Sequence, residues 1–500
     1  MASLLVWVVG GLLAYRLAIS VYRLYFHPLR KIPGPKLAAM TTAYQFYYEI
    51  IKQGTFIWHL EKLHEIYGPI IRVGPREVHI KDSEYYDTIY ASSGRRREKD
   101  AATVAQFDIA GSSFSSISPE VHRMRRSPVE KFFSKGAITR MEQNLQKYLD
   151  KLVAHVEQAQ KTHKVLTLDA GFAALTSDII HEYVFGIHTG NLDQEDFNEH
   201  IRDGVNGLFR LGHLARFIPW LQPTMNSMPR FLVEKLSPYA FALMDQKQFI
   251  HEQVVNIQNG QSTGQSGSVM EKLTSPGLPD HFKSARNLSD EGFALVIGGT
   301  ETTARSLSVG MFYLLSEPRH VQKLREELRA VMPTPTTKPT WNQLEQLPYL
   351  AGVVLETLRL STGIASRSPR VAPSESLVYK DYTIPPGHLV SQTNYFVLMD
   401  PSIFPDPEAF DPERWTRAAA KGERLDRYLV NFSKGSRICL GMNLAYAEIY
   451  LTIATLIRRF ELELFETTKK NIEFARDFGT PYPDEGNYSL RVLVKGLVSE

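Results

Sequence analysis

The chain has 500 residues and a formal net charge of +3, from 57 Lys and Arg against 54 Asp and Glu. This near balance argues against a nucleic-acid-binding protein, which would carry a strongly basic surface. Hydrophobic residues make up 43% of the chain, enough for a large core, and the single cysteine excludes a scaffold built on disulfides.

The first 26 residues predict a membrane anchor. Residues 1–15 carry no charged side chain, and only Arg16 and Arg23 interrupt the apolar sequence that continues to Phe26. A helix of this length can cross a hydrocarbon layer of about 30 Å if Arg16 reaches one face. The basic residues that follow favour a cytoplasmic location for the rest of the chain. A cleaved signal peptide, which would begin with basic residues, and an amphipathic surface helix are the alternatives.

The next segment, residues 27–36, contains Pro28, Pro33 and Pro35. Proline fixes its own φ and restricts the residue before it, so we expect a stiff elbow here. The remaining residues, 37–500, are expected to form one domain.

This domain has a mainly helical pattern. Apolar residues predict a long helix that has Ser289 as its N-cap and ends by residue 317. Two further helices are expected at about 348–360 and 442–460. Strands are predicted over four short runs, namely 70–73, 78–80, 376–384 and 489–494.

Two other segments lack a clear helix or strand pattern. Residues 259–268 are rich in Gly, Ser and Gln, which predicts a flexible surface loop. Residues 205–231 mix Phe, Leu and Trp with spaced Arg. This region is compatible with a lid over a pocket, a patch that dips into a membrane, or ordinary core packing.

The sequence around the cysteine is the strongest signal in the chain. It matches the pattern F-x-x-G-x-R-x-C-x-G at every fixed position, with Cys439 directly before a predicted helix. The N-terminal amides and the positive dipole end of a helix stabilise a thiolate. The glycines allow a tight turn and a close approach of the backbone to a bound group. A lone cysteine is more often a small buried hydrophobe, but this pattern favours a thiolate that binds iron and promotes O–O cleavage.

The pattern resembles the cysteine loop of the cytochrome P450 family. The resemblance implies a mainly α fold with a smaller β region and a single catalytic domain behind the anchor. It also implies haem b (iron protoporphyrin IX), with Cys439 as the metal ligand and Arg437 paired with a haem propionate. The cofactor-binding residues expected in this loop are Phe432, Gly435, Arg437, Cys439 and Gly441.

A second motif lies in the long predicted helix, before the cysteine loop. The sequence GGTETT, from Gly298 to Thr303, resembles the oxygen-activating segment of the family. Glycines inside a helix reduce its stability, so two adjacent ones predict close approach by something bulky, here haem and O₂. By resemblance, Thr302 hydrogen-bonds the oxygen and Glu301 helps to deliver protons through water, and these two are the expected catalytic residues.

A third motif combines Glu356 and Arg359, which match E-x-x-R on a predicted helix, with Arg414 in a later P-E-R segment. Residues three apart share a helix face, so Glu356 and Arg359 can pair. The family uses this trio to brace the cysteine loop, a structural role.

Three more residues are expected to hold the haem propionates. Arg126, in the segment that starts at His122, resembles the arginine of the family pattern W-x-x-x-R, and His122 stands where Trp is usual. Arg370 stands where the family has another propionate-binding arginine. A solvated basic face is the alternative for these side chains.

Within the family, the chain most resembles fungal microsomal members of secondary metabolism, the trichodiene-oxygenase type. The segments that carry this resemblance are 32–36, 67–69, 73–77, 132–134 and 406–412. It implies the endoplasmic reticulum membrane, a single-pass anchor and a cytosolic catalytic domain.

The implied reaction is the insertion of one oxygen atom from O₂ into an apolar small molecule, such as a terpenoid, polyketide or alkaloid. The chain shows no flavin or nicotinamide fingerprint, so NADPH-cytochrome P450 reductase on the same membrane is the expected electron donor. Three alternative functions are an enzyme of the same fold that rearranges or dehydrates its substrate without O₂, a non-catalytic haem sensor, and a membrane tether without haem. The first two have no use for Glu301 and Thr302, and the third has none for the Cys439 loop.

Substrate-contact residues carry over by position only. They are Phe293, Val296 and Ile297 in the long helix, residues 363–365, and residues 478–480.

Overall fold

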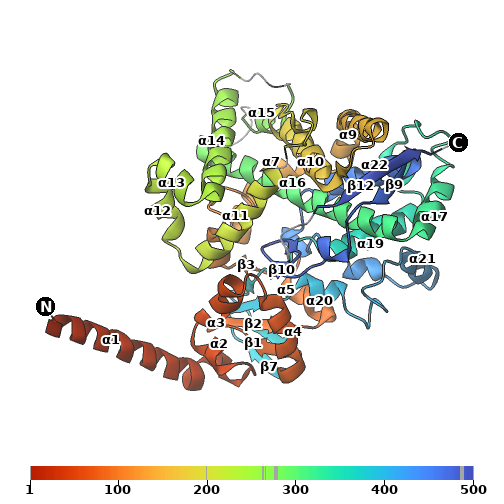
Figure 1. Cartoon of the computed structure of the whole chain (residues 1–500). Coiled ribbons are helices and arrows are strands. Elements are labelled where there is room, and N and C mark those ends of the chain that lie inside the picture. The colour runs from red at the N-terminus through yellow and green to blue at the C-terminus, as the bar shows by residue number, and fades with distance from the viewer. Residues whose placement is uncertain are drawn as a thin grey trace.

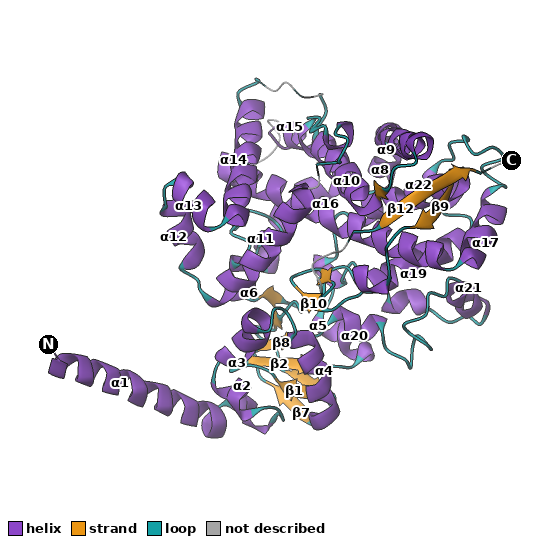
Figure 2. Ribbon diagram, viewed as in Figure 1, coloured by secondary structure: helices purple, strands orange, loops and turns teal. Residues whose placement is uncertain are grey.

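The computed structural model describes residues 2–198, 200–261, 264, 266–274, 280–484 and 489–498. A large helical body lies beside a smaller unit that contains most of the strands, and an N-terminal helix extends away from the smaller unit (Figure 1). Figure 2 shows that helices dominate and that the strands form small separate sheets. The mainly α fold with a smaller β region is therefore confirmed.

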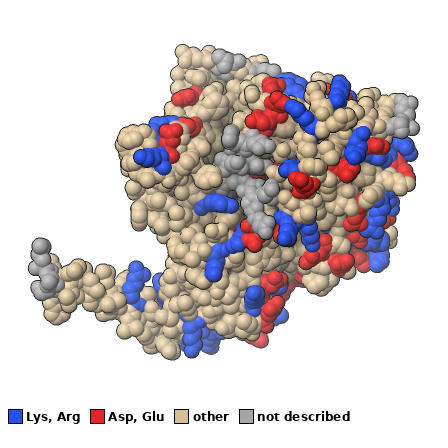
Figure 3. Space-filling view, in the orientation of Figure 1, with Lys and Arg blue, Asp and Glu red and all other residues tan. Residues whose placement is uncertain are grey.

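The N-terminal helix α1 (Ala2–Val21) continues as a turn of π-helix (Tyr22–Phe26). The segment Leu4–Phe26 has a mean hydropathy of 2.0 and no buried residue, and it is long and apolar enough to cross a membrane. Few charged atoms mark this helix in Figure 3, whereas acids and bases alternate over the body.

The smaller unit is built on a five-stranded sheet in the order β1-β2-β8-β5-β3. Strands β1 and β2 are antiparallel, with Ile70 opposite Ile80, and β2 runs parallel to β8, with Val78 opposite Val390. Their buried side chains form a core of their own with Leu29 and other residues. The strands of the chain are β1 (Ile70–Arg72), β2 (Glu77–Ile80), β3 (Glu98–Lys99), β4 (Leu166–Thr167), β5 (Arg370–Val371), β6 (Leu377–Tyr379), β7 (Tyr382–Ile384), β8 (Leu389–Ser391), β9 (Phe460–Leu464), β10 (Arg476–Asp477), β11 (Pro481–Tyr482) and β12 (Arg491–Leu497).

Short helices surround this unit, and long helices form the body (Figure 1). The helices around the sheet are α2 (Lys36–Met40), α3 (Ala43–Phe46), α4 (Phe56–Tyr67), α5 (Tyr86–Ile89) and α20 (Asn394–Leu398), with the π-helix η3 (Tyr47–Ile51). Those of the body are α6 (Ala101–Ala105), α7 (Pro119–Glu130), α8 (Lys135–Arg140), α9 (Glu142–Thr162), α10 (Leu168–Phe185), α15 (Val269–Thr274), α16 (Ala285–Ser316), α17 (Pro318–Leu328), α18 (Trp341–Leu344), α19 (Pro348–Ser361), α21 (Glu413–Ala420) and α22 (Met442–Arg459).

Helix α16 is the central element of the body. It packs along α10, and its other neighbours include α19 and α22. The cap of this helix differs from the prediction: the Ser284 side chain accepts the Asn287 N–H at 3.3 Å, so Ser284 is the N-cap. Ser289 lies inside the helix, where its hydroxyl donates to the Ala285 carbonyl. The predicted end holds, because Pro318 forces the preceding residue into an extended conformation.

The other predicted elements agree closely with the structure. Helices α19 and α22 end within a residue of their predicted bounds, and the segment 376–384 forms the hairpin of β6 and β7. The segment 259–268 connects α14 to α15, although Ser262, Thr263 and Gln265 lie outside the described residues.

The region 205–231 is helical. Its helices are α11 (His200–Phe217), α12 (Leu221–Ser227) and α13 (Arg230–Leu236), followed by α14 (Pro238–Gln258). Helix α11 runs between α14 and the smaller unit and contacts both α16 and η3. The side chains of Trp220 and Phe231 are 65% and 72% exposed, so core packing does not account for them.

Candidate active site

The loop before α22 presents Cys439. The Cys439 N–H donates to the Phe432 carbonyl at 2.8 Å, which closes the loop. Gly435 has a φ of +69°, and a Cβ there would lie 2.2 Å from the Ala91 carbonyl oxygen. Only glycine fits this position, because both the left-handed backbone and the close approach exclude a side chain.

The sulfur of Cys439 faces the N-terminus of α22. Burial raises the pKa of the thiol, while the N–H groups of Gly441 and Met442, which donate to the sulfur, and the charge of Arg126 lower it. The side chain remains accessible from one side, although protein surrounds it on the others. Burial has the larger effect, so the pKa of the thiol is raised, and the N–H groups and Arg126 would support the thiolate once a metal cation binds it.

The predicted proton-delivery residues lie on α16. Glu301 is buried, and Thr302 donates its hydroxyl hydrogen to the Gly298 carbonyl at 2.8 Å. Arg305, one turn further along the helix, is also near Glu301: burial lowers the pKa of Arg305, and the Glu301 charge opposes this. The Thr302 oxygen keeps its acceptor capacity, as a hydrogen-bonding role would require.

The two adjacent glycines of α16 have different neighbours. A Cβ on Gly299 would lie 2.8 Å from the Ile180 side chain, so this glycine permits the close contact of α16 with α10. A Cβ on Gly298 would meet nothing within 4 Å, and the same is true of Gly441 in the cysteine loop. Only one of the two glycines therefore borders open space, and the expectation that both make room for a bound group is wrong.

Four cationic side chains converge beside the cysteine loop. They are Lys99, Arg126, Arg370 and Arg437. Burial, and then the charges of the three arginines, place the pKa of Lys99 far below its usual value. Burial and the same group of cations lower the pKa of His122 to about 3, so His122 is neutral.

Each of the three predicted arginines is held by backbone carbonyls. Arg126 donates to the Ile438 carbonyl at 2.6 Å, which connects α7 to the cysteine loop. Arg437 donates to the Ser116 and Ile117 carbonyls at 2.7 and 2.9 Å. Arg370 donates to the Ser368 carbonyl and hydroxyl at 3.1 and 2.6 Å. These contacts fix the positions of the three arginines. Among the described residues, Arg126 also has an ion pair with Glu130 at 3.6 Å, whereas Arg370 and Arg437 have none.

These features fit haem. A convergence of cations requires anionic charge nearby, which two propionates would supply. The Nε atom of Arg437 is buried without a hydrogen-bond partner among the described residues, as expected for a group that completes its bonding with a ligand. Gly298 and Gly441 border open space on α16 and on the cysteine loop, as a flat macrocycle next to the Cys439 sulfur would need.

The Glu356 cluster consists of Glu356, Arg359, Arg414 and Trp415, and the helix α19 that carries Glu356 is joined to the start of the cysteine loop by the Asn431 amide, which donates to the Leu358 carbonyl. Arg359 and Arg414 donate to the Glu356 carboxylate at 2.7 to 3.0 Å, and the Trp415 indole N–H donates to it at 3.0 Å. Glu356 and Arg359 are fully buried. The predicted pairing of the three charged residues is present, and Trp415 is a member that sequence reasoning missed.

Sequence reasoning also missed Lys99 and Glu448. Lys99 has no distinguishing signal, because it follows three arginines in a polar segment. Glu448 is a lone acid in the apolar helix α22, a signal that could have been used. Burial raises the pKa of Glu448 far above the usual value, against the effect of the Thr303 hydroxyl that donates to it, and this hydrogen bond connects α22 to α16.

The predicted substrate-contact residues lie in two places. Phe293, Val296 and Ile297 are buried along α16. The segments 363–365 and 478–480 meet each other, since the Ala365 N–H donates to the Gly479 carbonyl at 2.9 Å.

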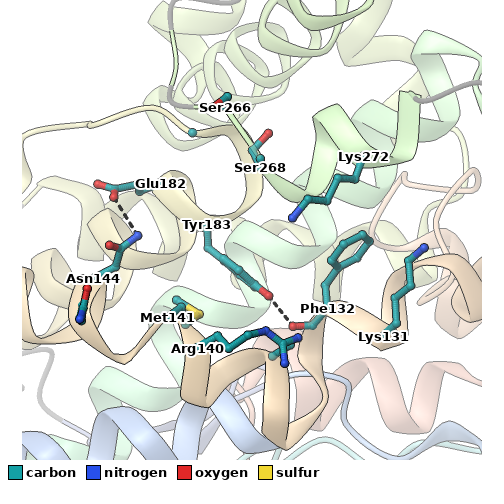
Figure 4. Close-up of a pocket in the computed structure, with 14 residues that line it drawn as sticks. Lys131, Phe132, Arg140, Met141, Asn144, Glu182, Tyr183, Ser266, Ser268 and Lys272 are labelled. Carbon is teal, nitrogen blue, oxygen red and sulfur yellow. Dashed lines mark hydrogen bonds between the residues drawn. The ribbon is translucent and has the colours of Figure 1, made fainter.

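A surface pocket of about 450 Å³ lies elsewhere, among α8, α9, α10 and the residues before α15 (Figure 4). Its wall includes Lys131, Arg140, Glu182 and Lys272, and it contains none of the predicted site residues. Its polar wall does not suit an apolar substrate.

Comparison with known proteins identifies the family. The family model described as Cytochrome P450 matches residues 33–485. The cytochrome P450 monooxygenase aflU of Aspergillus parasiticus is 44% identical over 497 residues, which cover 97% of each chain. The cytochrome P450 monooxygenase TRI4 of Trichoderma arundinaceum is 43% identical over 464 residues, 92% of this chain and 90% of its own. Conidiogenone synthase PchP450 of Penicillium rubens is 41% identical over 492 residues, 97% or more of both chains. The resemblance predicted from the sequence is thus confirmed: the chain belongs to the cytochrome P450 family, and it is an oxidoreductase similar to fungal monooxygenases.

Proposed function

We propose that the protein is a haem-thiolate monooxygenase that inserts one oxygen atom into an apolar small molecule of fungal secondary metabolism. A C–H bond, O₂, two electrons and two protons give a C–OH group and water. The observation that carries the proposal is the Cys439 loop, with its sulfur at the start of α22, together with the Glu301–Thr302 pair on α16. By resemblance to the fungal members of the family, the proposed substrate is a terpenoid, polyketide or alkaloid.

Haem b is the proposed cofactor, with Cys439 as its iron ligand. Arg437, Arg126 and Arg370 would pair with the propionates, His122 would donate a hydrogen bond, and Lys99 would add a further charge. When bound, haem supplies the iron at which O₂ is reduced. The iron would favour the ionised sulfur, and the N–H groups of Gly441 and Met442 would stabilise its negative charge.

Glu301 and Thr302 are proposed to deliver protons. Glu301 would pass protons from water to the reacting oxygen, and the Thr302 hydroxyl would orient that water by accepting and donating hydrogen bonds. A rearranging enzyme or a haem sensor would not need this pair, so its function separates the proposal from both.

NADPH-cytochrome P450 reductase is the proposed electron donor. Residues 1–26 would anchor the protein in the endoplasmic reticulum membrane, followed by the elbow 27–36 and the cytosolic catalytic domain 37–500. The exposed Trp220 and Phe231, at 65% and 72% exposure, would lie in the lipid headgroup region beside the anchor. Apolar substrates would then reach the protein from the bilayer.

The carbon monoxide difference spectrum of the reduced protein in microsomes tests the haem-thiolate assignment. A red-shifted Soret band is expected in the wild type and not in Cys439→Ser. Haem binding without this band in the wild type would refute the assignment. Thr302→Ala should retain the band, but with reductase and NADPH it should consume electrons with little product. Unchanged coupling in that variant would contradict the proton-delivery role.

A further inference from the structure

A second set of buried charges lies between helix α11 and the smaller unit. This Glu49 cluster comprises Glu49, Glu77, His213, Arg216, Ser366, Arg367 and Asp477. They come from η3, β2, α11, the segment before β5, and β10. Of its charged members, Glu49, Glu77, His213, Arg367 and Asp477 are all less than 9% exposed.

On the side opposite α11, the Arg367 guanidinium pairs with two carboxylates, and a third carboxylate, that of Asp477, lies near Glu49. Arg367 donates to Glu77 at 2.8 Å and to Glu49 at 3.2 Å. Asp477 accepts the Ser366 hydroxyl at 2.6 Å and the Gly479 N–H at 2.9 Å. This side therefore carries an excess of negative charge in a buried region.

Helix α11 supplies the balancing positive charges. Nδ1 of His213 lies 3.4 Å from a Glu49 carboxylate oxygen. Burial and then the charge of Arg367 lower the pKa of Arg216, while the nearby charges of Glu77 and Glu49 act in the opposite direction. The Arg210 guanidinium lies 4.6 Å from the centre of the Phe478 ring.

The contacts of His213 favour its protonated form. Its Nδ1 forms an ion-pair contact of 3.4 Å with a Glu49 carboxylate oxygen. Its Nε2 lies 3.3 Å from the Ser366 hydroxyl, which donates its hydrogen to Asp477 at 2.6 Å when Asp477 is ionised. Both ring nitrogens then act as donors, which favours an imidazolium beside Glu49.

This cluster also joins the predicted substrate-contact segments. Ser366 and Arg367 directly follow 363–365, and Asp477 directly precedes 478–480. Helix α11 thus contacts the elements that carry both sets of predicted substrate-contact residues: α16, and, through His213 and Arg210, the segments at Ser366 and Phe478. Moving the C-terminal half of α11 away from Glu49 would separate it from these segments.

We propose that His213 and its partners Glu49, Arg367 and Asp477 form an ionic latch that holds α11 closed and limits the admission of bulky apolar ligands. His213 is a positioning residue in this role, since it acts through α11. The inference rests on the proposed haem-thiolate site, because the latch regulates access to it.

The latch weakens as the pH rises. Burial disfavours the imidazolium of His213, but the hydrogen bond and charge of Glu49, and then Asp477, outweigh it and raise its pKa, while Arg216 acts against them. Arg367 and Glu77 complete the charged groups around this pair. A raised pKa means that the stabilising charge is present below the usual histidine range and disappears as the pH passes the raised value.

Access can be measured without a substrate, through binding of the azole clotrimazole to the ferric haem in a stopped-flow experiment. His213→Gln should increase the rate constant of clotrimazole binding by about tenfold at pH 7, because losing one charge of a buried pair mainly accelerates opening. Carbon monoxide, which is small, should bind the reduced protein at an unchanged rate. Raising the pH from 6.5 to 8.5 should accelerate clotrimazole binding in the wild type but not in His213→Gln.

His188→Gln is the matched control, since His188 pairs with Asp193 at 2.5 Å on the surface. It should match the wild type in every rate. Glu49→Gln should resemble His213→Gln.

Hydrogen–deuterium exchange gives a reading that does not depend on haem. In His213→Gln, amides of the C-terminal half of α11 should exchange faster, while those of α16 should not change. Equal exchange and equal clotrimazole rates in His213→Gln and wild type would overturn the latch. Failure of the wild-type protein to bind haem or azole would instead overturn the proposed function. In that case, the hydrogen–deuterium exchange result would still show whether His213 holds α11 in place.

Discussion

The Glu356 cluster and the Glu49 cluster are both buried and both pair carboxylates with arginines, but they differ in how completely their atoms are paired. Every guanidinium nitrogen of Arg359 and Arg414 donates a hydrogen bond, and both Glu356 oxygens accept at least two. In the Glu49 cluster, one oxygen of Glu49 and one terminal nitrogen of Arg367 have no hydrogen-bond partner among the described residues.

This difference in hydrogen-bond pairing indicates that the two clusters have different roles. A fully satisfied buried network holds one arrangement, whereas a partly satisfied one is less stable and can be released. The Glu356 cluster contains no histidine, while the Glu49 cluster contains His213. The first therefore suits a permanent support for the Cys439 loop, and the second suits a contact that opens.

The largest loss of stability is expected for Glu356→Ala, because this substitution leaves two buried guanidinium groups without their carboxylate. Removing one partner of a buried ion pair costs about 3–5 kcal/mol. Urea unfolding should show this loss, and the reduced protein should lack the red-shifted carbon monoxide band. The control Glu408→Ala removes an exposed pair with Lys469 and should leave both measurements unchanged. A stable, thiolate-ligated Glu356→Ala protein would show that the cluster is not a support.

A smaller loss of stability is expected for Arg367→Gln. Glu77 retains the Ser391 hydroxyl as a donor at 2.9 Å, and Arg216 remains near both carboxylates. We expect about 1–3 kcal/mol less stability in urea, the typical cost of an unsatisfied buried group. The carbon monoxide band should persist, since this cluster does not support the cysteine loop. Loss of the band would remove the distinction between the two clusters.

The pH dependence of stability should also separate them, with an effect smaller than that of Arg367→Gln. His213 has a raised pKa, so its contribution is complete below the usual histidine range and disappears at alkaline pH. Glu49 has the opposite sign: burial raises its pKa, but His213 and then Arg367 lower it to about 2, so its contribution disappears only as the pH falls from about 4.5 toward this value. The urea concentration at the midpoint of unfolding should fall in the wild type as the pH is raised from 6 to 9, and it should fall less in His213→Gln. An equal slope in both proteins would mean that another group is responsible.

The smallest effect is expected for Trp415→Phe. It removes one hydrogen bond to Glu356, but the oxygen that accepts it keeps the Arg359 Nε at 3.0 Å. A loss of about 0.5–1.5 kcal/mol in urea, with the carbon monoxide band intact, is expected. A much larger loss would mean that the indole fixes the cluster rather than completing it.

The sequence was sufficient to predict the site residues wherever they lie close together in one short segment. The Cys439 loop, the Glu301–Thr302 pair and the Glu356–Arg359 pair each occupy a few neighbouring residues, so spacing reveals them. The N-cap of α16 was misplaced because Ser284 and Ser289 are both plausible caps, and only the backbone geometry distinguishes them.

The Glu49 cluster could not be predicted in this way. Glu49, His213, Arg367 and Asp477 are scattered along the chain, and each is an ordinary polar residue in its own segment. Only the folded arrangement of η3, α11 and β10 brings them together. The same holds for Lys99, because the arginines that surround it come from three other segments of the chain.

The connection of the N-terminal helix has a mechanical consequence. Arg72 of β1 donates to the Arg23 carbonyl at 2.8 Å, Arg23 donates to the Met40 carbonyl at 2.5 Å, and the Arg72 N–H donates to the Pro33 carbonyl at 2.6 Å. A Cβ on Gly34 would lie 2.5 Å from the Arg72 carbonyl oxygen, so the elbow lies directly on the sheet. The segment that follows α1 is thus fixed to the sheet, so the tilt of α1 in a membrane would determine how the sheet is oriented toward the lipid surface.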